Sequence, residues 1–439
     1  MCGIWGFVGV EDPINIQNAW EGLCSISHRG PDSWGFFTNQ DGIVTTETAI
    51  PDGTRSTFLG NRRLSILDLS ASGNQPMKQD GSILVYNGEV YNYKSLRERL
   101  RGLGYTFNSD SDTEVVLAAY REYGTNCVEH LSGMFAFAVY DESAEELFLA
   151  RDRLGIKPLY FTQDQGGIAF ASEVTALLDG NIIPRELNKT AIADFLRVGY
   201  VPGPETIIKG VRELPAGTTC IYDTTTGEVT TTRYWSPTFD DSSTRSPKRL
   251  RELLQQSISD RLMSDVPLGA FLSGGLDSSA IVALMTECSD TSKSVHTCSI
   301  GFEESSYNES EYATAVANEI GTTHCPREVS GEDVQAALPE IIEGMDQPSV
   351  DAINTYFVSE TAVNDELTVA LSGLGSDELL FGYPTFSYIR RLYPFARIVQ
   401  RLPQDFRDSI GELFDRADAK VSRLPLAEIG DVIRSSPSF

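Results

Sequence analysis

Cysteine at the second position is the first residue of this sequence that could do covalent chemistry. Removal of the initiator methionine from Met1-Cys2-Gly3 would leave the thiol of Cys2 beside its own α-amine. An α-amine has a pKa of about 7.7–8.0, so it could act as a base near neutral pH. Nucleophile and base would then come from one residue, although most cysteines are small buried hydrophobes and Cys2 alone does not decide the matter.

Several polar residues after Cys2 could bind an amino acid that carries an amide. Arg63 could hold a carboxylate through two parallel hydrogen bonds. Asn87 and Gly88 end an apolar strand, where a side-chain amide and a backbone N–H could form an oxyanion hole. The run 110–114 opens a predicted helix and offers an anion to an ammonium group. Each feature alone could be a turn, a salt bridge or a helix cap. Together they indicate a site that cleaves the amide of a zwitterionic amino acid.

Two glycine- and serine-rich loops in the second half could bind phosphate. Ser273–Ser279 (SGGLDSS) lies between a predicted strand and a predicted helix, so backbone N–H groups and the helix N-terminus could face an anion. It is not a G-x-x-x-x-G-K-[ST] loop. Asp277 could supply an oxygen ligand to Mg²⁺, and so could Asp377 in the second loop, Ser372–Glu378. Because both loops follow parallel strands, we expect them at one edge of a sheet.

Helices and strands are arranged differently in the two halves of the chain. Short strands with two interrupting helices, at 93–103 and 113–123, predict an α+β domain rich in antiparallel sheet. The polar stretch 236–247 predicts a linker. Strands and helices alternate after it, which predicts a doubly wound parallel sheet. The expected elements of the second half are helices at 248–263, 278–288, 310–320, 334–343 and 355–363, and strands at 268–272, 295–301 and 367–371.

Composition excludes several classes of protein. The formal net charge is −27, which disfavours binding to nucleic acid or to an anionic membrane surface. No apolar run approaches the ~20 residues that span a bilayer. The seven cysteines contain no C-x-x-C pair, and they favour a reducing cytoplasm.

The motifs MCGIWGFVG, HRGPDSWG, RRLSILDLS, QPM, YNGEVYNY, SDTEVVL, GMFAFAVYD, ARDRLGIKPLY and ASEVTAL resemble class II glutamine amidotransferases, and more narrowly the glutamine-hydrolysing asparagine synthetase family. The resemblance implies an Ntn-hydrolase-type α+β sandwich at 2–220 and an ATP pyrophosphatase domain with a doubly wound parallel sheet at 236–439. It implies that Cys2 attacks the glutamine amide, while Asn87 and Gly88 stabilise the oxyanion. Arg63 would hold the glutamine carboxylate, and Glu89 and Asp112 its ammonium group, with Asn87 also in the glutamine site.

The same resemblance implies that SGGLDSS is the pyrophosphate loop of an enzyme that adenylates its substrate. The residues implied for ATP are Leu272, Ser273, Gly274, Gly275, Asp277, Ser278, Ile300, Ser372 and Gly373, with Mg²⁺ on Asp277 and Asp377. Two departures stand out. Leu374 occupies a position where the best-known asparagine synthetases carry glutamate, and the chain ends soon after Glu378, which predicts an incomplete synthetase domain.

We therefore expect a glutamine- and ATP-dependent ligase that converts aspartate to asparagine in the cytoplasm. The expected partners are glutamine, aspartate and ATP, with neither nucleic acid nor membrane. The resemblance leaves a homodimer open. One alternative is an amidotransferase that acts on another carboxylate, which Leu374 favours. The other is a truncated pseudo-synthetase that retains glutaminase activity only, which the short C-terminus favours.

Overall fold

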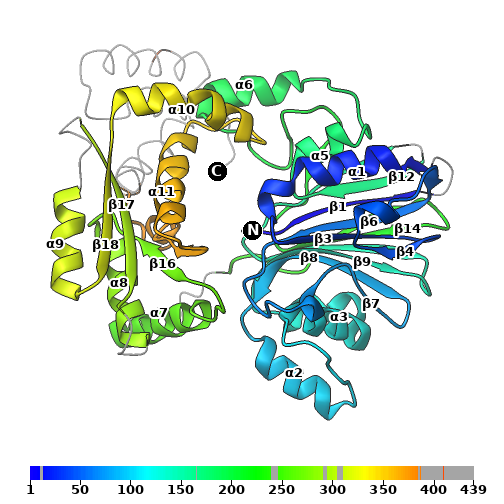
Figure 1. Cartoon of the computed structure of the whole chain (residues 1–439), viewed down its shortest axis with the longest axis horizontal. Coiled ribbons are helices and arrows are strands. Elements are labelled where there is room, and N and C mark those ends of the chain that lie inside the picture. The colour runs from blue at the N-terminus through cyan, green and yellow to red at the C-terminus, as the bar shows by residue number, and fades with distance from the viewer. Residues whose placement is uncertain are drawn as a thin grey trace. The chain divides into compact units, whose positions relative to one another are not determined.

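The strand that directly follows Cys2, β1 (Gly3–Gly9), lies in the middle of a seven-stranded antiparallel sheet (Figure 1). All seven of its residues are buried, as expected for a strand covered on both faces. The sequence pattern predicted no strand here, because a continuous apolar run carries no alternation. In spatial order the sheet contains β13 (Arg212–Glu213), β11 (Tyr160–Asp164), β12 (Gly167–Ala171), β1, β6 (Thr57–Arg63), β3 (Ser33–Thr38) and β4 (Gly42–Val44).

A second antiparallel sheet, of six strands, packs against the first. The apolar layer between them includes Ile4 and Leu59 from the first sheet and Val85 and Ala138 from the second, all fully buried. The order of the second sheet is β15 (Val229–Arg233), β14 (Thr218–Asp223), β10 (Glu146–Arg151), β9 (Gly133–Asp141), β8 (Ser82–Val90) and β7 (Met77–Gln79). A separate pair, β2 (Ile14–Asn15) and β5 (Thr54–Arg55), lies outside both sheets.

Helices cover the outer face of each sheet, which gives four layers (Figure 1). The helix α1 (Ile16–Ser25) buries Ile16, Ala19 and Leu23, a helical spacing, against Trp5 of β1. Burying a large apolar side chain such as Trp5 contributes ~1.5–3 kcal/mol. The other helices of this half are α2 (Tyr93–Gly102), α3 (Asp112–Tyr123), α4 (Cys127–His130), α5 (Val174–Asp179) and α6 (Lys189–Val198).

A four-stranded parallel sheet follows in the order β18 (Thr323–Val329), β17 (His296–Phe302), β16 (Leu268–Phe271) and β19 (Val369–Leu371). Helices lie on both of its faces: α7 (Pro247–Arg261), α8 (Leu276–Cys288) and α9 (Ser310–Ile320) share one core, and α10 (Gly331–Gly344) and α11 (Ala352–Asn364) another. The doubly wound prediction is confirmed. The sequence analysis missed β18, which lies between the helices predicted at 310–320 and 334–343.

The computed structural model describes residues 1–9, 13–164, 166–238, 246–289, 294–303 and 310–383, with Phe386 and Ser409. The chain divides into two units, Met1–Leu371 and Ser372–Phe439, and each is described by itself. Most of the linker predicted at 236–247 lies outside the described residues, and Pro247 already belongs to α7. The predicted domain limits, 2–220 and 236–439, stay a prediction, although β14 and β15 extend the second sheet beyond residue 220.

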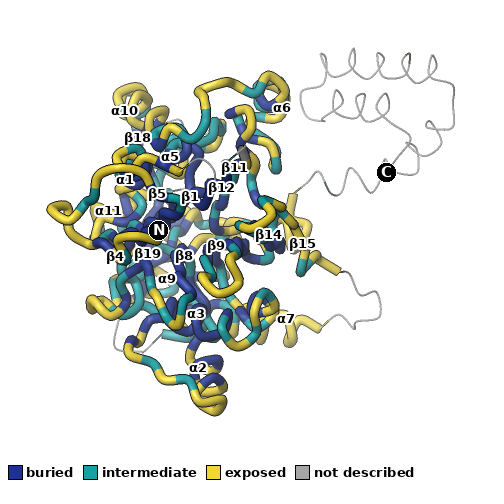
Figure 2. Tube along the Cα trace, turned by 90° about the vertical axis from the view of Figure 1, so that its right-hand side faces the viewer, coloured by how far each residue is buried: buried dark blue, intermediate teal, exposed yellow. Residues whose placement is uncertain are grey.

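Burial follows the layers of the fold. Figure 2 shows many strands of the first unit in the buried class, whereas α7 and α10 are mainly exposed. Within the described ranges, no helix is long and apolar enough to cross a bilayer.

Candidate functional site

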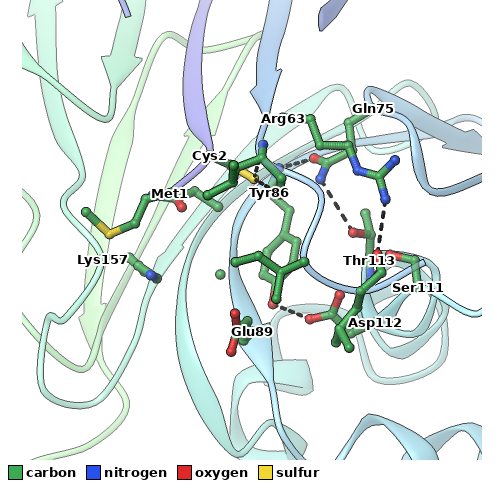
Figure 3. Close-up of a pocket in the computed structure, with 15 residues that line it drawn as sticks. Met1, Cys2, Arg63, Gln75, Tyr86, Glu89, Ser111, Asp112, Thr113 and Lys157 are labelled. Atoms are coloured by element: carbon green, nitrogen blue, oxygen red, sulfur yellow. Dashed lines mark hydrogen bonds between the residues drawn. The ribbon is translucent and has the colours of Figure 1, made fainter. Parts of the chain in front are cut away.

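A pocket at the start of β1 brings together the six residues predicted to bind or cleave an amide (Figure 3). They come from strands β6 and β8, from the first turn of α3 and from the residue before β1. The lining residues are Met1, Cys2, Arg63, Leu64, Ile66, Leu67, Gln75, Tyr86, Asn87, Gly88, Glu89, Ser111, Asp112, Thr113 and Lys157.

The thiol of Cys2, which lines this pocket, is held by the backbone of Leu64. Its Sγ donates to the Leu64 carbonyl at 3.5 Å and accepts from the Leu64 N–H at 3.4 Å. The Cys2 carbonyl accepts from Nε of Arg29 at 3.0 Å. Burial raises the pKa of the Cys2 thiol, while the Leu64 N–H and the neighbouring amine and Lys157 charges act in the opposite direction. The thiol is therefore fixed in place and depends on its surroundings for activation.

The side-chain amide of Asn87 is buried in the pocket without a hydrogen-bond partner. Neither Nδ2 nor Oδ1 finds one among the described residues, although Asn87 is only 1% exposed. A buried polar group left in this state costs ~1–3 kcal/mol and requires an explanation. At the next position, a Cβ on Gly88 would lie 2.4 Å from the Met134 carbonyl oxygen, so no other residue fits there. The amide is thus available to a ligand that enters the pocket.

Three ionisable groups line the pocket beside Cys2: the Glu89 carboxylate, the Lys157 amine and the Met1 α-amine. Burial raises the pKa of Glu89 to about 7, with Lys157 acting in the opposite direction. Burial also lowers the pKa of Lys157, which is 5% exposed, and lowers the pKa of the Met1 amine to about 6. In Figure 3 the side chains of Glu89 and Lys157 both extend toward the pocket centre. Burial therefore shifts the Met1 amine toward its neutral form.

Asp112 is anchored by groups that the sequence analysis did not identify. Its Oδ2 accepts from the Tyr86 hydroxyl at 2.7 Å and from the Val90 N–H at 2.9 Å. Burial raises the pKa of Asp112, while these bonds favour its charged form. Gln75 braces the same wall, because its Oε1 accepts from the Tyr86 N–H at 2.7 Å. The carboxylate position is consequently set by both β8 and α3.

Arg63 lines the pocket while holding the loop that follows it. Nη1 donates to the Ser70 carbonyl at 3.1 Å and to Oδ1 of Asn74 at 2.9 Å. Nη2 donates to the carbonyls of Leu67 and Asp68. Both terminal nitrogens are therefore engaged, and binding a carboxylate through two parallel bonds would require the loop to rearrange.

The Ser273–Ser279 loop lies at the carboxyl end of β16, where the strand order reverses between β17 and β19. Such a reversal is where open α/β sheets bind ligands. Gly274 has φ +81°, and a Cβ there would lie 2.6 Å from the Ala313 nitrogen. The loop is braced internally, since Ser278 Oγ lies 3.0 Å from Ser273 Oγ and accepts from its N–H at 3.2 Å. The positive φ and the close approach of residues 312 and 313 therefore both require glycine at position 274.

The remaining residues predicted to bind ATP in the first unit differ in their surroundings. Leu272 is buried in the sheet core. Asp277 is half-buried in the first turn of α8, where its carboxylate could act as an oxygen ligand. Ile300 is half-buried on β17 and packs against the cluster of Val329, Ile341 and Phe357. Among the described residues, no group of three or more His, Cys, Asp or Glu is arranged to hold a metal ion.

The second unit begins with the other predicted ATP loop. Ser372 Oγ accepts from the Leu374 N–H at 3.2 Å, and the Gly373 carbonyl accepts from the Ser376 N–H at 3.2 Å. Asp377 lies in the first turn of α12 (Ser376–Leu380). The Leu374 side chain is 86% exposed. The predicted meeting of this loop with Ser273–Ser279 stays a prediction.

Comparison with known proteins matches both parts of this chain. A family model described as glutamine amidotransferase domain matches residues 1–235, and one described as asparagine synthase matches residues 249–429. A putative glutamine-hydrolysing asparagine synthetase 2 from Methanocaldococcus jannaschii is 35% identical over 440 residues, which cover 92% of this chain and 81% of the relative. The chain belongs to the glutamine-hydrolysing asparagine synthetase family.

Other relatives in this family are longer than the present chain. Asparagine synthetase 1 from Bacillus subtilis is 38% identical over 413 residues, 91% of this chain and 61% of the relative. Asparagine synthetase B from Escherichia coli is 32% identical over 410 residues, 88% of this chain and 65% of the relative. The chain thus spans less than two thirds of the length of these two relatives.

Some pocket residues of this family member were missed by sequence reasoning. Gln75, Tyr86 and Lys157 lie within or beside the motifs that carry the family resemblance, so the motifs themselves were the available signal. Only their contacts give them roles. Tyr86 has an apolar strand pattern around it, and Lys157 lies in a loop between β10 and β11, so neither pattern distinguishes a pocket residue from a structural one.

Proposed function

We propose that this chain is an asparagine synthetase that uses glutamine and ATP. The overall reaction would be L-aspartate, L-glutamine, ATP and water giving L-asparagine, L-glutamate, AMP and diphosphate. The observation that carries the proposal is that the Asn87 amide, which has no partner among the described residues, lies in the same pocket as the Cys2 thiol. A thiol beside an unused amide donor is what amide cleavage requires.

In the first half-reaction the sulfur of Cys2 would attack the glutamine side-chain carbonyl. The Nδ2 group of Asn87 and the N–H of Gly88 would stabilise the oxyanion that forms. Once Met1 is removed, the Cys2 amine would take the thiol proton and deliver it to the leaving ammonia. An α-amine has an ordinary pKa of about 7.7–8.0, which suits a base near neutral pH. Water would then hydrolyse the thioester and release glutamate.

Substrate binding would use the charged residues around this centre. The glutamine ammonium group would lie between the carboxylates of Glu89 and Asp112, and the glutamine carboxylate would approach Arg63. Because Oδ2 of Asp112 already accepts two hydrogen bonds, the ammonium group would be bound through Oδ1. Because burial raises the pKa of Glu89 to about 7, this carboxylate would be fully charged near pH 7 only with a cation beside it, which supports a role in binding the ammonium group.

In the second half-reaction a side-chain oxygen of aspartate would attack the α-phosphorus of ATP and displace diphosphate. Ammonia would then attack the aspartyl carbonyl and displace AMP. The Ser273–Ser278 backbone and Gly274 would cradle the departing diphosphate, with Leu272 and Ile300 beside the nucleotide and Ser372 and Gly373 contributing from the second loop. Mg²⁺ on Asp277 and Asp377 would neutralise phosphate charge.

A second candidate is transfer of ammonia to a different carboxylate. Leu374 favours it, because an exposed leucine can neither bind an amine nor relay a proton. The pocket around Cys2 would work in the same way in this case. Only the acceptor activated by ATP would differ.

The location and partners of the chain also belong to the proposal. All seven cysteines are free thiols, which supports a reducing cytoplasm. Glutamine, aspartate and ATP would be its small-molecule partners, and a homodimer remains the family-based expectation.

The deciding experiment is aspartate-dependent ATP–pyrophosphate exchange by the purified chain with Mg²⁺, with glutaminase activity measured in the same preparation. Exchange that requires aspartate would support the proposal. Exchange driven by another carboxylate would support the second candidate. Glutaminase activity without any exchange would refute the ligase and leave a glutaminase alone.

A further inference from the structure

Asp346, in the loop between α10 and α11, binds the turn that leads from β12 into α5. Its Oδ2 accepts from the Val174 N–H at 2.9 Å. Its Oδ1 accepts from the Thr175 N–H at 2.8 Å and from the Thr175 hydroxyl at 3.0 Å. Both oxygens of one carboxylate thus hold two successive backbone N–H groups of a segment 171 or more positions away in the sequence.

The same turn is bound on its other side to the strand that carries Cys2. Ser172 Oγ accepts from the Ile4 N–H at 3.0 Å, and the Ser172 N–H donates to the Ile4 carbonyl at 2.8 Å. Glu173 Oε1 accepts from Nη1 of Arg29 at 2.7 Å. Arg29 in turn donates from Nε to the Cys2 carbonyl at 3.0 Å. The turn 172–175 and Arg29 therefore link Asp346 to the backbone of Cys2.

This connection is buried along most of its length. Ser172 is fully buried, Val174 is 1% exposed, and the side chains of Arg29 and Glu173 are 9% and 12% exposed. Charged hydrogen bonds in such surroundings are short and strong, and they cannot be exchanged for water without loss. Removing the Asp346 carboxylate would leave the Val174 N–H buried and without its acceptor.

The Asp346 loop makes further contacts with the same half of the chain. Gln347 Oε1 accepts from the Ile207 N–H at 2.9 Å, and the Val350 N–H donates to the Gly199 carbonyl at 3.0 Å. The loop leads directly into α11, which packs on the parallel sheet. A movement of α11 would therefore be transmitted to Asp346.

We propose that Asp346, a residue of the ATP-binding half, is a positioning residue for glutamine cleavage, acting on Cys2 through the 172–175 turn and Arg29. The inference rests on the proposed function. It makes the rate of ammonia release sensitive to the state of the parallel-sheet domain. Asp346 touches neither glutamine nor the thiol, so its effect falls on the geometry of the reacting atoms and hence on kcat rather than on KM.

The test compares Asp346→Ala, Asp346→Asn and a matched control in the full chain. The control is Asp351→Ala. Asp351 is an exposed aspartate in the same loop, and its side chain does not cap α11. Glutaminase kcat and KM are measured for each, with aspartate-dependent exchange as a check on the ATP-binding half. Asp346→Asn keeps one acceptor oxygen and covers the case in which the alanine variant does not fold.

We expect Asp346→Ala to lower kcat about three- to thirtyfold, with KM unchanged within about twofold. Asp346→Asn should lose less, and Asp351→Ala should match the unmodified chain. In a double-mutant cycle, Glu173→Gln and Asp346→Ala should be non-additive, since both interrupt one connection. Additive effects, or a kcat for Asp346→Ala or Asp346→Asn equal to that of Asp351→Ala, would overturn the inference. An unmodified chain that cannot hydrolyse glutamine would instead refute the proposed function, and the inference with it.

Discussion

Replacing Asn87 by leucine should remove glutaminase activity without destabilising the protein. The side chains have similar shapes, so the change mainly removes one donor and one acceptor. Both atoms are buried and have no partner among the described residues. Their loss should therefore relieve a desolvation cost rather than break a bond.

Asn87→Leu should have opposite effects on the free energy of unfolding and on kcat. Each orphaned polar group costs ~1–3 kcal/mol, so Asn87→Leu should leave the free energy of unfolding unchanged or raise it by about 1–3 kcal/mol. Removing one oxyanion donor should lower kcat about 10²- to 10³-fold. Stability and activity should thus move in opposite directions, which loss of a merely structural residue would not produce.

Asn61 supplies a matched control for this experiment. It is also fully buried, and its Oδ1 has no partner among the described residues, but its Nδ2 donates to the Tyr86 carbonyl at 3.3 Å. Because Asn61→Leu also breaks this hydrogen bond, it should lower the free energy of unfolding by ~1 kcal/mol relative to Asn87→Leu. Chemical denaturation and glutaminase kinetics are measured for both variants. The reasoning fails if Asn87→Leu destabilises as much as Asn61→Leu, or if it keeps more than a tenth of the unmodified kcat.

Three further predictions concern charge and backbone at the two sites. Burial raises the pKa of Glu89 from 4.5 to about 7, so the stability that comes from its neutral form is complete below pH 4.5 and is lost as pH rises through 7. Urea unfolding should therefore find Glu89→Gln more stable than the unmodified chain by roughly 3 kcal/mol at pH 8 and by much less at pH 5. An equal difference in the free energy of unfolding at the two pH values would contradict this. The Lys157 charge favours the Cys2 thiolate. Lys157→Met should therefore slow iodoacetamide alkylation of Cys2 at pH 7 by up to about tenfold for each unit by which the pKa of the thiol rises. An unchanged alkylation rate would exclude that influence. Gly274→Ala would put a side chain at φ +81°, with its Cβ 2.6 Å from the Ala313 nitrogen. The variant should therefore lose ATP–pyrophosphate exchange while glutaminase activity persists. Retained exchange would show that the loop does not bind phosphate.

Much of the site could be predicted from sequence because its residues occur in short motifs. Asn87, Gly88 and Glu89 are consecutive, and Asp112 opens a helix that its neighbours define, so local patterns located them. That they share a pocket with Cys2 depends on β6 and β8 lying in two sheets packed face to face. No local pattern encodes that arrangement, and it was anticipated only from the combination of residue types and from the family resemblance.

Two strands that the sequence analysis missed, β1 and β18, lack a clear local pattern for different reasons. The strand β1 is buried on both faces, so it lacks the alternation that reveals a half-exposed strand. The strand β18 contains Pro326 and charged residues, which disfavour a strand prediction, yet it forms the edge of the parallel sheet and tolerates them there. Tertiary position decided both strands.

The contacts of Asp346 and Arg63 show the limit of reading residue types alone. Arg63 was predicted as a carboxylate clamp, but both its terminal nitrogens hold the loop that follows it. Asp346 carries no motif that distinguishes it from an ordinary surface acid. Its partners lie far away in the sequence, so only the folded chain identifies them.

The measurement that tests the central claim most directly is asparagine formation by Cys2→Ala, with glutamine and with ammonium salts as alternative nitrogen sources. The account predicts that glutamine-dependent synthesis is lost, whereas ammonia-dependent synthesis continues at a rate close to that of the unmodified chain. Equal loss of both activities, or glutamine-dependent synthesis that survives the substitution, would contradict it.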